Sequence, residues 1–193
     1  SDPTQHAARI VLSENAGTGT PVDPPVVTPP ASNPDALTSL KTGDKVYIVA
    51  PAYDIALSAT KTGYYNVGID VSSGFSALGD AETWVVTVNA DGTYTFTSAT
   101  GSVLALADEF NSLNDTGSHK SWALEEQATG VYYVKNTTRE VYLDWYVEKN
   151  NWSTYNTASG DAYELSFYAA DSTGTVTPPV DGGEDPIDPP TGG

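Results

Sequence analysis

The sequence predicts an all-β domain made of three similar units. Two observations indicate this: apolar and polar residues alternate in short segments, and one pattern recurs at a fixed spacing. The segments that begin at Trp84 and Trp122 show the two-residue period of half-buried strands. No stretch has the 3.6-residue period of an amphipathic helix.

The repeat is clearest when residues 84–106 are aligned without a gap to residues 122–144, a spacing of 38 residues. A third copy is expected at residues 43–59, where Tyr47 precedes Leu57 by the ten residues that separate Tyr94 from Leu104. A closing strand is expected at residues 163–170, with Leu165 in the position of the tryptophans. The aligned pairs are Trp84 with Trp122, Gly92 with Gly130, Tyr94 with Tyr132, and Leu104 with Tyr142.

Each unit is expected to contain the same elements in the same order. A strand begins at the tryptophan and ends at a turn, "ADG" or "ATG", in which glycine can take the positive φ of a hairpin. A second alternating strand, another turn and a short third strand follow. The repeated rings are interpreted as core: Trp84, Trp122, Tyr47, Tyr94 and Tyr132.

Three units of about 40 residues each predict a β-trefoil-like fold, a closed barrel capped by three hairpins. A β-sandwich and a three-bladed arrangement remain alternatives at this point.

Proline divides the chain into domain and linkers. Twelve of the 13 prolines lie before residue 35 or after residue 177, and such segments are extended and lack an apolar face. We therefore assign residues 18–36 and 172–193 to linkers and residues 37–171 to the domain. Residues 1–17 contain one apolar run, "ARIVLS", interpreted as the remnant of a preceding domain or as a disordered tail.

The composition excludes several classes of function. A net charge of −17 disfavours binding to nucleic acid and to anionic membranes. The absence of cysteine excludes disulfides, thiolate metal sites and thiol nucleophiles. No apolar run approaches the length of a membrane span, so no membrane insertion is expected. We expect no cofactor.

The acidic composition, rich in Thr, Ser, Asn and Tyr, together with Pro/Thr linkers, is typical of secreted bacterial multimodular proteins. We expect a secreted or cell-surface protein of a Gram-positive bacterium. We also expect a monomeric domain, covalently linked to neighbouring domains.

Catalytic and metal signals are weak. His119 is the sole histidine of the predicted domain and lies in no triad motif. Residues 108–115, "DEFNSLND", contain enough oxygens for a loose calcium site, with a solvated acidic turn as the alternative. A glycoside hydrolase needs only two suitably spaced carboxylates, and the sequence leaves that alternative open.

One order of residues resembles the ricin-type (R-type) lectins. It runs Gly–x–Tyr–x–apolar–x–Asn, a turn, Tyr–Leu–Asp, and then a strand headed by x–x–Trp. The pieces here are "GVYYVKNTTREVYLDW" (130–145) and the strand heads "AETW" (81–84) and "HKSW" (119–122). The resemblance covers about 130 residues. It implies a divergent β-trefoil carbohydrate-binding module.

The chain departs from the family pattern at three positions. Glu82 and Lys120 stand two residues before the tryptophans, where the family usually has glutamine, and Leu165 replaces the third tryptophan.

The resemblance also implies where a sugar would bind. In such lectins an Asp of the short strand, an aromatic ring of the next loop and an Asn form a shallow pocket. Asp144 fits the first role, and the rings after it do not recur in the other units, as expected of binding loops. The candidate platforms and amides of unit three are Trp145, Tyr146, Trp152, Tyr155, Asn150 and Asn151. The weaker copies are Tyr64, Tyr65 and Asn66 in unit one, and Asp108, Phe110 and Asn111 in unit two.

Other interpretations stand beside this hypothesis. Trp152 and Tyr155 are also suited to pin a long loop against the barrel. The expected function is non-catalytic glycan or polysaccharide binding that targets a parent enzyme or adhesin, rather than an enzymatic activity. A protein-interaction or spacer domain and a glycoside hydrolase are the alternatives.

Overall fold

The computed structural model describes residue 33 and residues 35–171, and within that part of the chain ten strands and a single 3₁₀ turn (Pro51–Tyr53) form. Predictions for residues 1–32 and 172–193 lie outside the described residues. The strands are β1 (Lys45–Ala50), β2 (Ile55–Thr62), β3 (Tyr65–Asp70), β4 (Trp84–Val88), β5 (Tyr94–Ser98), β6 (Trp122–Ala128), β7 (Val131–Asn136), β8 (Val141–Tyr146), β9 (Asn151–Tyr155) and β10 (Ser166–Ala169).

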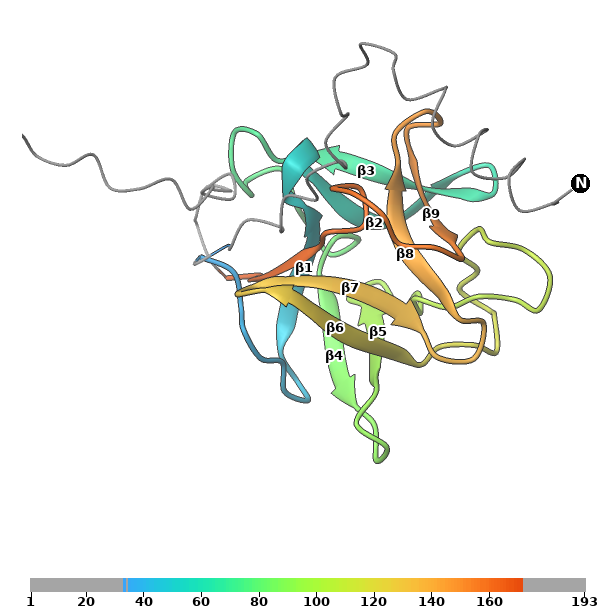
Figure 1. Ribbon diagram of the computed structural model, residues 1–193. Helices are drawn as coiled ribbons and strands as arrows, with labels where there is room; N and C mark the ends of the chain where they lie inside the picture. The colour runs from blue at the N-terminus through green and yellow to red at the C-terminus, as the bar shows by residue number, and fades with distance from the viewer. Residues whose placement is uncertain (1–32, 34, 172–193) are drawn as a thin grey trace, which may run out of the picture.

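A closed barrel is formed by β1, β4, β5, β6, β7 and β10 (Figure 1). Each strand pairs antiparallel with the next, and β10 pairs with β1. The bridge between Tyr132 and Leu165 closes the ring between β7 and the start of β10. The β2–β3 and β8–β9 hairpins and a short bridged segment around Leu106 and Leu113 cap one end.

This arrangement is an all-β β-trefoil, as the repeat predicts. Closure of the barrel excludes the β-sandwich, because a sandwich keeps two separate sheets.

The threefold repeat is visible in the hydrogen-bonded register, but one sequence match is wrong. Val46 pairs with Trp84, Tyr94 with Trp122, and Tyr132 with Leu165. Val46, and not Tyr47, is therefore the counterpart of Tyr94 and Tyr132. Because side chains alternate across a strand, this one-residue shift places Tyr47 on the other face of β1. There its ring packs against Phe75, with ring centroids 5.1 Å apart.

A second match is also shifted by one residue. Val103 bridges to Thr97 in unit two, whereas Tyr142 pairs with Lys135 in unit three. Leu143 is thus the counterpart of Leu104. Both leucines are buried, as is Leu57 of unit one.

The two repeated tryptophans connect each barrel strand to the preceding unit. The indole Nε1 of Trp84 donates to the carbonyl oxygen of Leu57 (3.1 Å), and that of Trp122 donates to the carbonyl oxygen of Leu104 (2.8 Å). Leu165 fills the third position without such a donor and is fully buried. Leucine at this position therefore keeps the packing and lacks one hydrogen bond.

The N-terminal edge of the domain lies before residue 37, the boundary predicted from proline. Asn33 and Ala36 are buried against the barrel. Asn33 donates from its backbone N–H to Thr129 O (2.7 Å) and from Nδ2 to Tyr168 Oη (2.5 Å). Gly130 has a φ of +74°, and a Cβ there would lie 2.3 Å from the Asn33 oxygen, so glycine lets the segment pass.

Replacing Asn33 by alanine is expected to lower the free energy of unfolding by about 1–3 kcal/mol, because buried hydrogen-bonding groups lose their partner. Ser39→Ala, at an exposed position on the same segment, is the matched control and should change little. Denaturant unfolding of both variants tests this. Equal midpoints would show that the Asn33 side chain contributes no stability.

Candidate functional site

The segment from Tyr142 to Tyr155 forms the β8–β9 hairpin, and its strand alternation decides which side chains face outward. Cross-strand pairs on the inner face are Leu143 with Thr154 and Trp145 with Trp152. Those on the outer face are Tyr142 with Tyr155, Asp144 with Ser153, and Tyr146 with Asn151. Figure 1 shows this hairpin beside β2 and β3.

Trp145 and Trp152 are core residues, which corrects their assignment as sugar platforms. They are 4% and 0% exposed, and their rings pack edge to face with centroids 5.7 Å apart. The Trp152 indole donates to Ala56 O (3.3 Å). The Trp145 ring lies against Gly68, where a Cβ would come within 2.6 Å of it. Neither ring offers a free face to a ligand.

The predicted asparagines have different positions. Asn66 is buried and donates to Ser58 O (2.8 Å), so it is a structural residue and not a ligand contact. Asn150 has a φ of 54° in the β8–β9 turn, where asparagine tolerates the left-handed region. Asn150 and Asn151 both line a cavity between this turn and β3.

Asp144 is the most unusual residue of the hairpin. It lies on the outer face of β8, yet the residue is only 6% exposed. The β9–β10 connection covers it, because the Trp145 N–H donates to Ala162 O (3.0 Å) and holds that segment beside β8. Burial raises the pKa of the Asp144 carboxyl to about 6. Among the described residues, Oδ1 has no hydrogen-bond donor.

The Asp144 carboxylate lines a cavity of about 430 Å³, a size typical of small-ligand sites. We call this the Asp144 cavity. Two of its rings are substantially exposed, Tyr146 at 40% and Tyr155 at 55%. Burial and the Asp144 charge raise the pKa of Tyr163 to about 12. Its hydroxyl is protonated at neutral pH, like that of an ordinary tyrosine, and can donate a hydrogen bond. The lining residues are Asn111, Asp144, Tyr146, Glu148, Ser153, Thr154, Tyr155 and Tyr163.

The structure therefore brings three of the predicted residues, Asp144, Tyr146 and Tyr155, together in the lining of one cavity. Sequence reasoning missed Tyr163 and Glu148. Tyr163 lies in a turn-rich segment next to the closing strand, and its only sequence signal is an extra ring before Leu165. Glu148 lies within the same aromatic stretch as Asp144.

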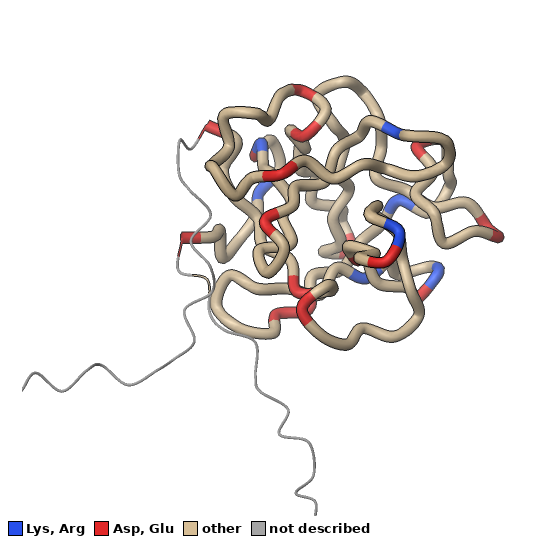
Figure 2. Tube along the Cα trace, turned by 90° about the horizontal axis from the view of Figure 1, so that it is seen from above, with Lys and Arg blue, Asp and Glu red and all other residues tan. Residues whose placement is uncertain are grey.

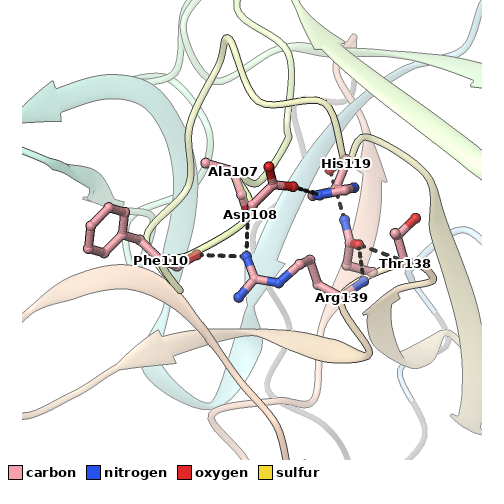
Figure 3. Close-up of polar contacts among 7 residues, drawn as sticks. Ala107, Asp108, Phe110, His119, Thr138 and Arg139 are labelled. Atoms are coloured by element: carbon pink, nitrogen blue, oxygen red, sulfur yellow. Dashed lines mark hydrogen bonds and ion pairs between the residues drawn. The ribbon is translucent and has the colours of Figure 1, made fainter.

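The weaker copies of units one and two do not form complete sites. Tyr64 is 82% exposed in the β2–β3 turn, and Tyr65 is 45% exposed beside it. Asp108 Oδ1 lies 2.5 Å from His119 Nε2, so the Asp108 carboxylate already has a hydrogen-bond partner within unit two (Figure 3). Phe110 and Asn111 lie close to the β8–β9 hairpin, because the Thr154 N–H donates to Asn111 O (3.0 Å).

Charge and metal-ligand patterns add two findings. Figure 2 shows acidic residues on many loops of the domain, with few basic residues among them. Within residue 33 and residues 35–171, no group of three or more His, Cys, Asp or Glu side chains could hold a metal ion. In the "DEFNSLND" segment, the Asn114 side chain accepts a hydrogen bond from Thr116, and Asp115 Oδ1 lies 4.0 Å from Lys61 Nζ.

None of the helices in the described part of the chain could cross a membrane.

No protein-family model matches the chain, and no curated protein sequence is significantly similar to it. Solved structures are similar in fold. The designed threefold-symmetric protein ThreeFoil is 18% identical, with a TM-score of 0.53 over 64% of this chain and 97% of that one. The ricin B-like lectin of Macrolepiota procera, solved with lactose, is 13% identical, with a TM-score of 0.56 over 68% of this chain and 99% of that one.

A third similar structure is that of the endo-β-galactosidase of Clostridium perfringens that releases GlcNAcα1-4Gal. Its matched part is 10% identical to this chain, with a TM-score of 0.55. The likeness covers 65% of this chain and 32% of that one. At such identities the likeness establishes the fold alone, a β-trefoil, which this chain shares with both the designed protein and the Macrolepiota procera lectin.

Proposed function

We propose that this domain binds a glycan at the Asp144 cavity without catalysing a reaction. The single observation that carries the proposal is a buried carboxylate with an unpaired oxygen, placed beside two exposed tyrosine rings. A pyranose offers both complements. Its hydroxyls donate to a carboxylate, and its C–H face packs on the electron-rich face of a ring. The lectin-like fold supports the same function.

The roles of the side chains follow from their positions. Asp144 accepts from one or two sugar hydroxyls, which supplies the hydrogen bond that its buried oxygen lacks. Tyr155, the more exposed of the two rings, supplies the ring face, and the Tyr163 hydroxyl and Asn111 add hydrogen bonds. The proposal also concerns the larger protein to which the domain is linked. Such a domain holds a secreted parent protein at a polysaccharide and raises the local concentration of the parent protein there.

A glycan array probed with the full chain tests the proposal. Binding to at least one glycan class is expected, with loss of that signal in Asp144→Asn and a strong decrease in Tyr155→Ala. Asp91→Asn is the matched control, since Asp91 is an exposed carboxylate in the β4–β5 turn whose partner is Thr93. A folded protein that binds no glycan, or variants that bind like wild type, would contradict it and favour a spacer or protein-interaction role.

One observation supports a second candidate, the glycoside hydrolase. Asp144, with its raised pKa, shares the cavity with Glu148, and an acid paired with a carboxylate is the chemistry of glycosidic cleavage. Incubation with polysaccharides, followed by a reducing-end assay, separates the two. Release abolished by both Asp144→Asn and Glu148→Gln would establish hydrolysis. Binding without release supports the lectin role.

A further inference from the structure

A second cavity adjoins the Asp144 cavity on the same face of the cap. It has a volume of about 560 Å³ and shares Asn111, Tyr146 and Ser153 with the Asp144 cavity. Its other walls include Phe110 from unit two and Tyr65 from unit one. We call the two adjoining cavities the composite groove, since residues of all three units line it.

Two exposed rings belong to this second cavity, beyond those around Asp144. Phe110 is 65% exposed and Tyr65 is 45% exposed. Exposed rings gathered along one surface are typical of a binding surface, because contiguous apolar patches left open to water mark ligand grooves and interaction sites. The groove therefore presents more rings than one sugar unit bound at Asp144 could use.

The loop that carries Phe110 is held in place from two sides. Arg139 Nη1 donates to the carbonyl oxygens of Ala107 and of Phe110, the latter at 3.2 Å. Thr154 Oγ1 donates to Asn111 O (2.7 Å). Figure 3 shows the Phe110 ring pointing away from Arg139 while its carbonyl accepts the hydrogen bond. A ring held out on an anchored backbone is preorganised, which reduces the entropic cost of binding.

The charges of the groove narrow the ligand class. Asp144 and Glu148 lie in one cavity, Lys149 is the charged residue that lines the other, and the chain carries a net charge of −17. A polyanionic glycan would be repelled at the Asp144 end and by the domain as a whole. A neutral oligosaccharide, by contrast, would contact four ring faces and several hydroxyl- and amide-bearing side chains along the groove. The polar side chains include Asn111, Ser112 and Ser153.

We propose that the composite groove binds a neutral, linear oligosaccharide as one continuous site. One sugar unit lies at Asp144, and the following units lie over Tyr146 toward Phe110 and Tyr65. This differs from three independent pockets, one in each unit, because the unit-two and unit-one residues contact the ligand held by unit three. The inference rests on the proposed glycan-binding function and specifies its ligand.

Calorimetric titration of the full chain with oligosaccharide ladders tests the proposal. The ladders run from mono- to hexasaccharides of galactan, xylan, β-1,4-glucan and chitin. We expect affinity for one ladder to rise from mono- to tetrasaccharide. Phe110→Ala and Tyr65→Ala should each lower the tetrasaccharide affinity by about two- to tenfold, the value of one ring contact, and leave the monosaccharide affinity unchanged.

Tyr64→Ala is the matched control, since Tyr64 is adjacent in sequence and 82% exposed but lines neither cavity. It should bind every oligosaccharide as wild type does, and melting curves should show that all three variants are folded. Affinity that is independent of chain length and of Phe110 and Tyr65 would overturn the composite groove but leave the proposed function intact. A folded protein that binds none of these ladders would overturn the composite groove, and a glycan array with no binding at all would overturn the proposed function as well.

Discussion

Replacing Asp144 by asparagine is expected to weaken glycan binding by about 10- to 100-fold, because a charge-assisted hydrogen bond is lost. The same change is expected to stabilise the folded domain at neutral pH. Asparagine has the shape of aspartate but no charge, so it avoids the cost of holding a carboxylate in a covered position.

The direction of the stability effect follows from the raised pKa. The Asp144 carboxyl has a pKa of about 6 in the folded domain, above its ordinary value of 3.8. Its contribution to stability is therefore fully present below pH 3.8 and is lost as the pH rises through 6. With allowance for partial solvent screening, the loss is about 2 kcal/mol. Asp144→Asn should be more stable than wild type by about this amount near pH 7.5.

Denaturant unfolding at about pH 4 and about pH 7.5 measures this effect. The two proteins should differ at the higher pH and converge at the lower one. A variant that is less stable at neutral pH would show that the carboxylate makes a stabilising contact in the folded domain.

Glycan binding should have its own pH dependence. Binding favours the charged carboxylate, so the affinity of wild type should fall by about tenfold between about pH 7 and pH 5, as the pH passes through the pKa of Asp144. The weak residual binding of Asp144→Asn should not change over this range. An affinity of wild type that is constant over the same range would contradict the role of Asp144 as the acceptor.

Replacing Trp152 by alanine is expected to destabilise the domain by about 3–5 kcal/mol, because loss of a fully buried indole leaves a large cavity. The expected loss includes the hydrogen bond from Nε1 to Ala56 O. Tyr155→Ala is the opposite case. Tyr155 lies on the outer face of the same strand and is 55% exposed, so its removal should change stability by less than about 0.5 kcal/mol.

Thermal or denaturant unfolding, together with glycan titration, separates the two residues. Trp152→Ala should lose stability, whereas Tyr155→Ala should lose affinity and keep its unfolding midpoint. A stable Trp152→Ala variant with weakened binding would show that the indole faces the ligand, as the aromatic stretch alone suggests.

The fold could be predicted from the sequence because its determinants are local and repeated. Strand alternation, turn glycines and the spacing between Trp84 and Trp122 are all visible without coordinates. The strand register could not be predicted as well from the sequence. One residue more separates Tyr142 from Lys135 than separates Val103 from Thr97. An alignment without a gap therefore misplaces the third strand of one unit by one position relative to the other. A shift of one residue exchanges the two faces of a strand.

The site could be predicted only in part, for a related reason. The residues after Asp144 are interpreted from the sequence as a loop, but β8 continues through Tyr146. Alternation along that strand turns Trp145 inward and leaves Asp144 and Tyr146 outward. The position of Phe110 and Asn111 beside this hairpin depends on contacts between units, which no local pattern encodes.

The central claim is that a glycan binds in one place, on the outer face of the β8–β9 hairpin beside Asp144. The most direct test is an NMR titration of the ¹⁵N-labelled protein with an oligosaccharide that it binds, in which the chemical shifts of the backbone and indole N–H groups are measured. The account predicts that the largest changes occur at Asn111, Asp144, Tyr146 and Ser153, with small changes at the buried indoles of Trp84 and Trp122. Changes distributed over equivalent positions of the three units, or centred away from Asp144, would contradict it.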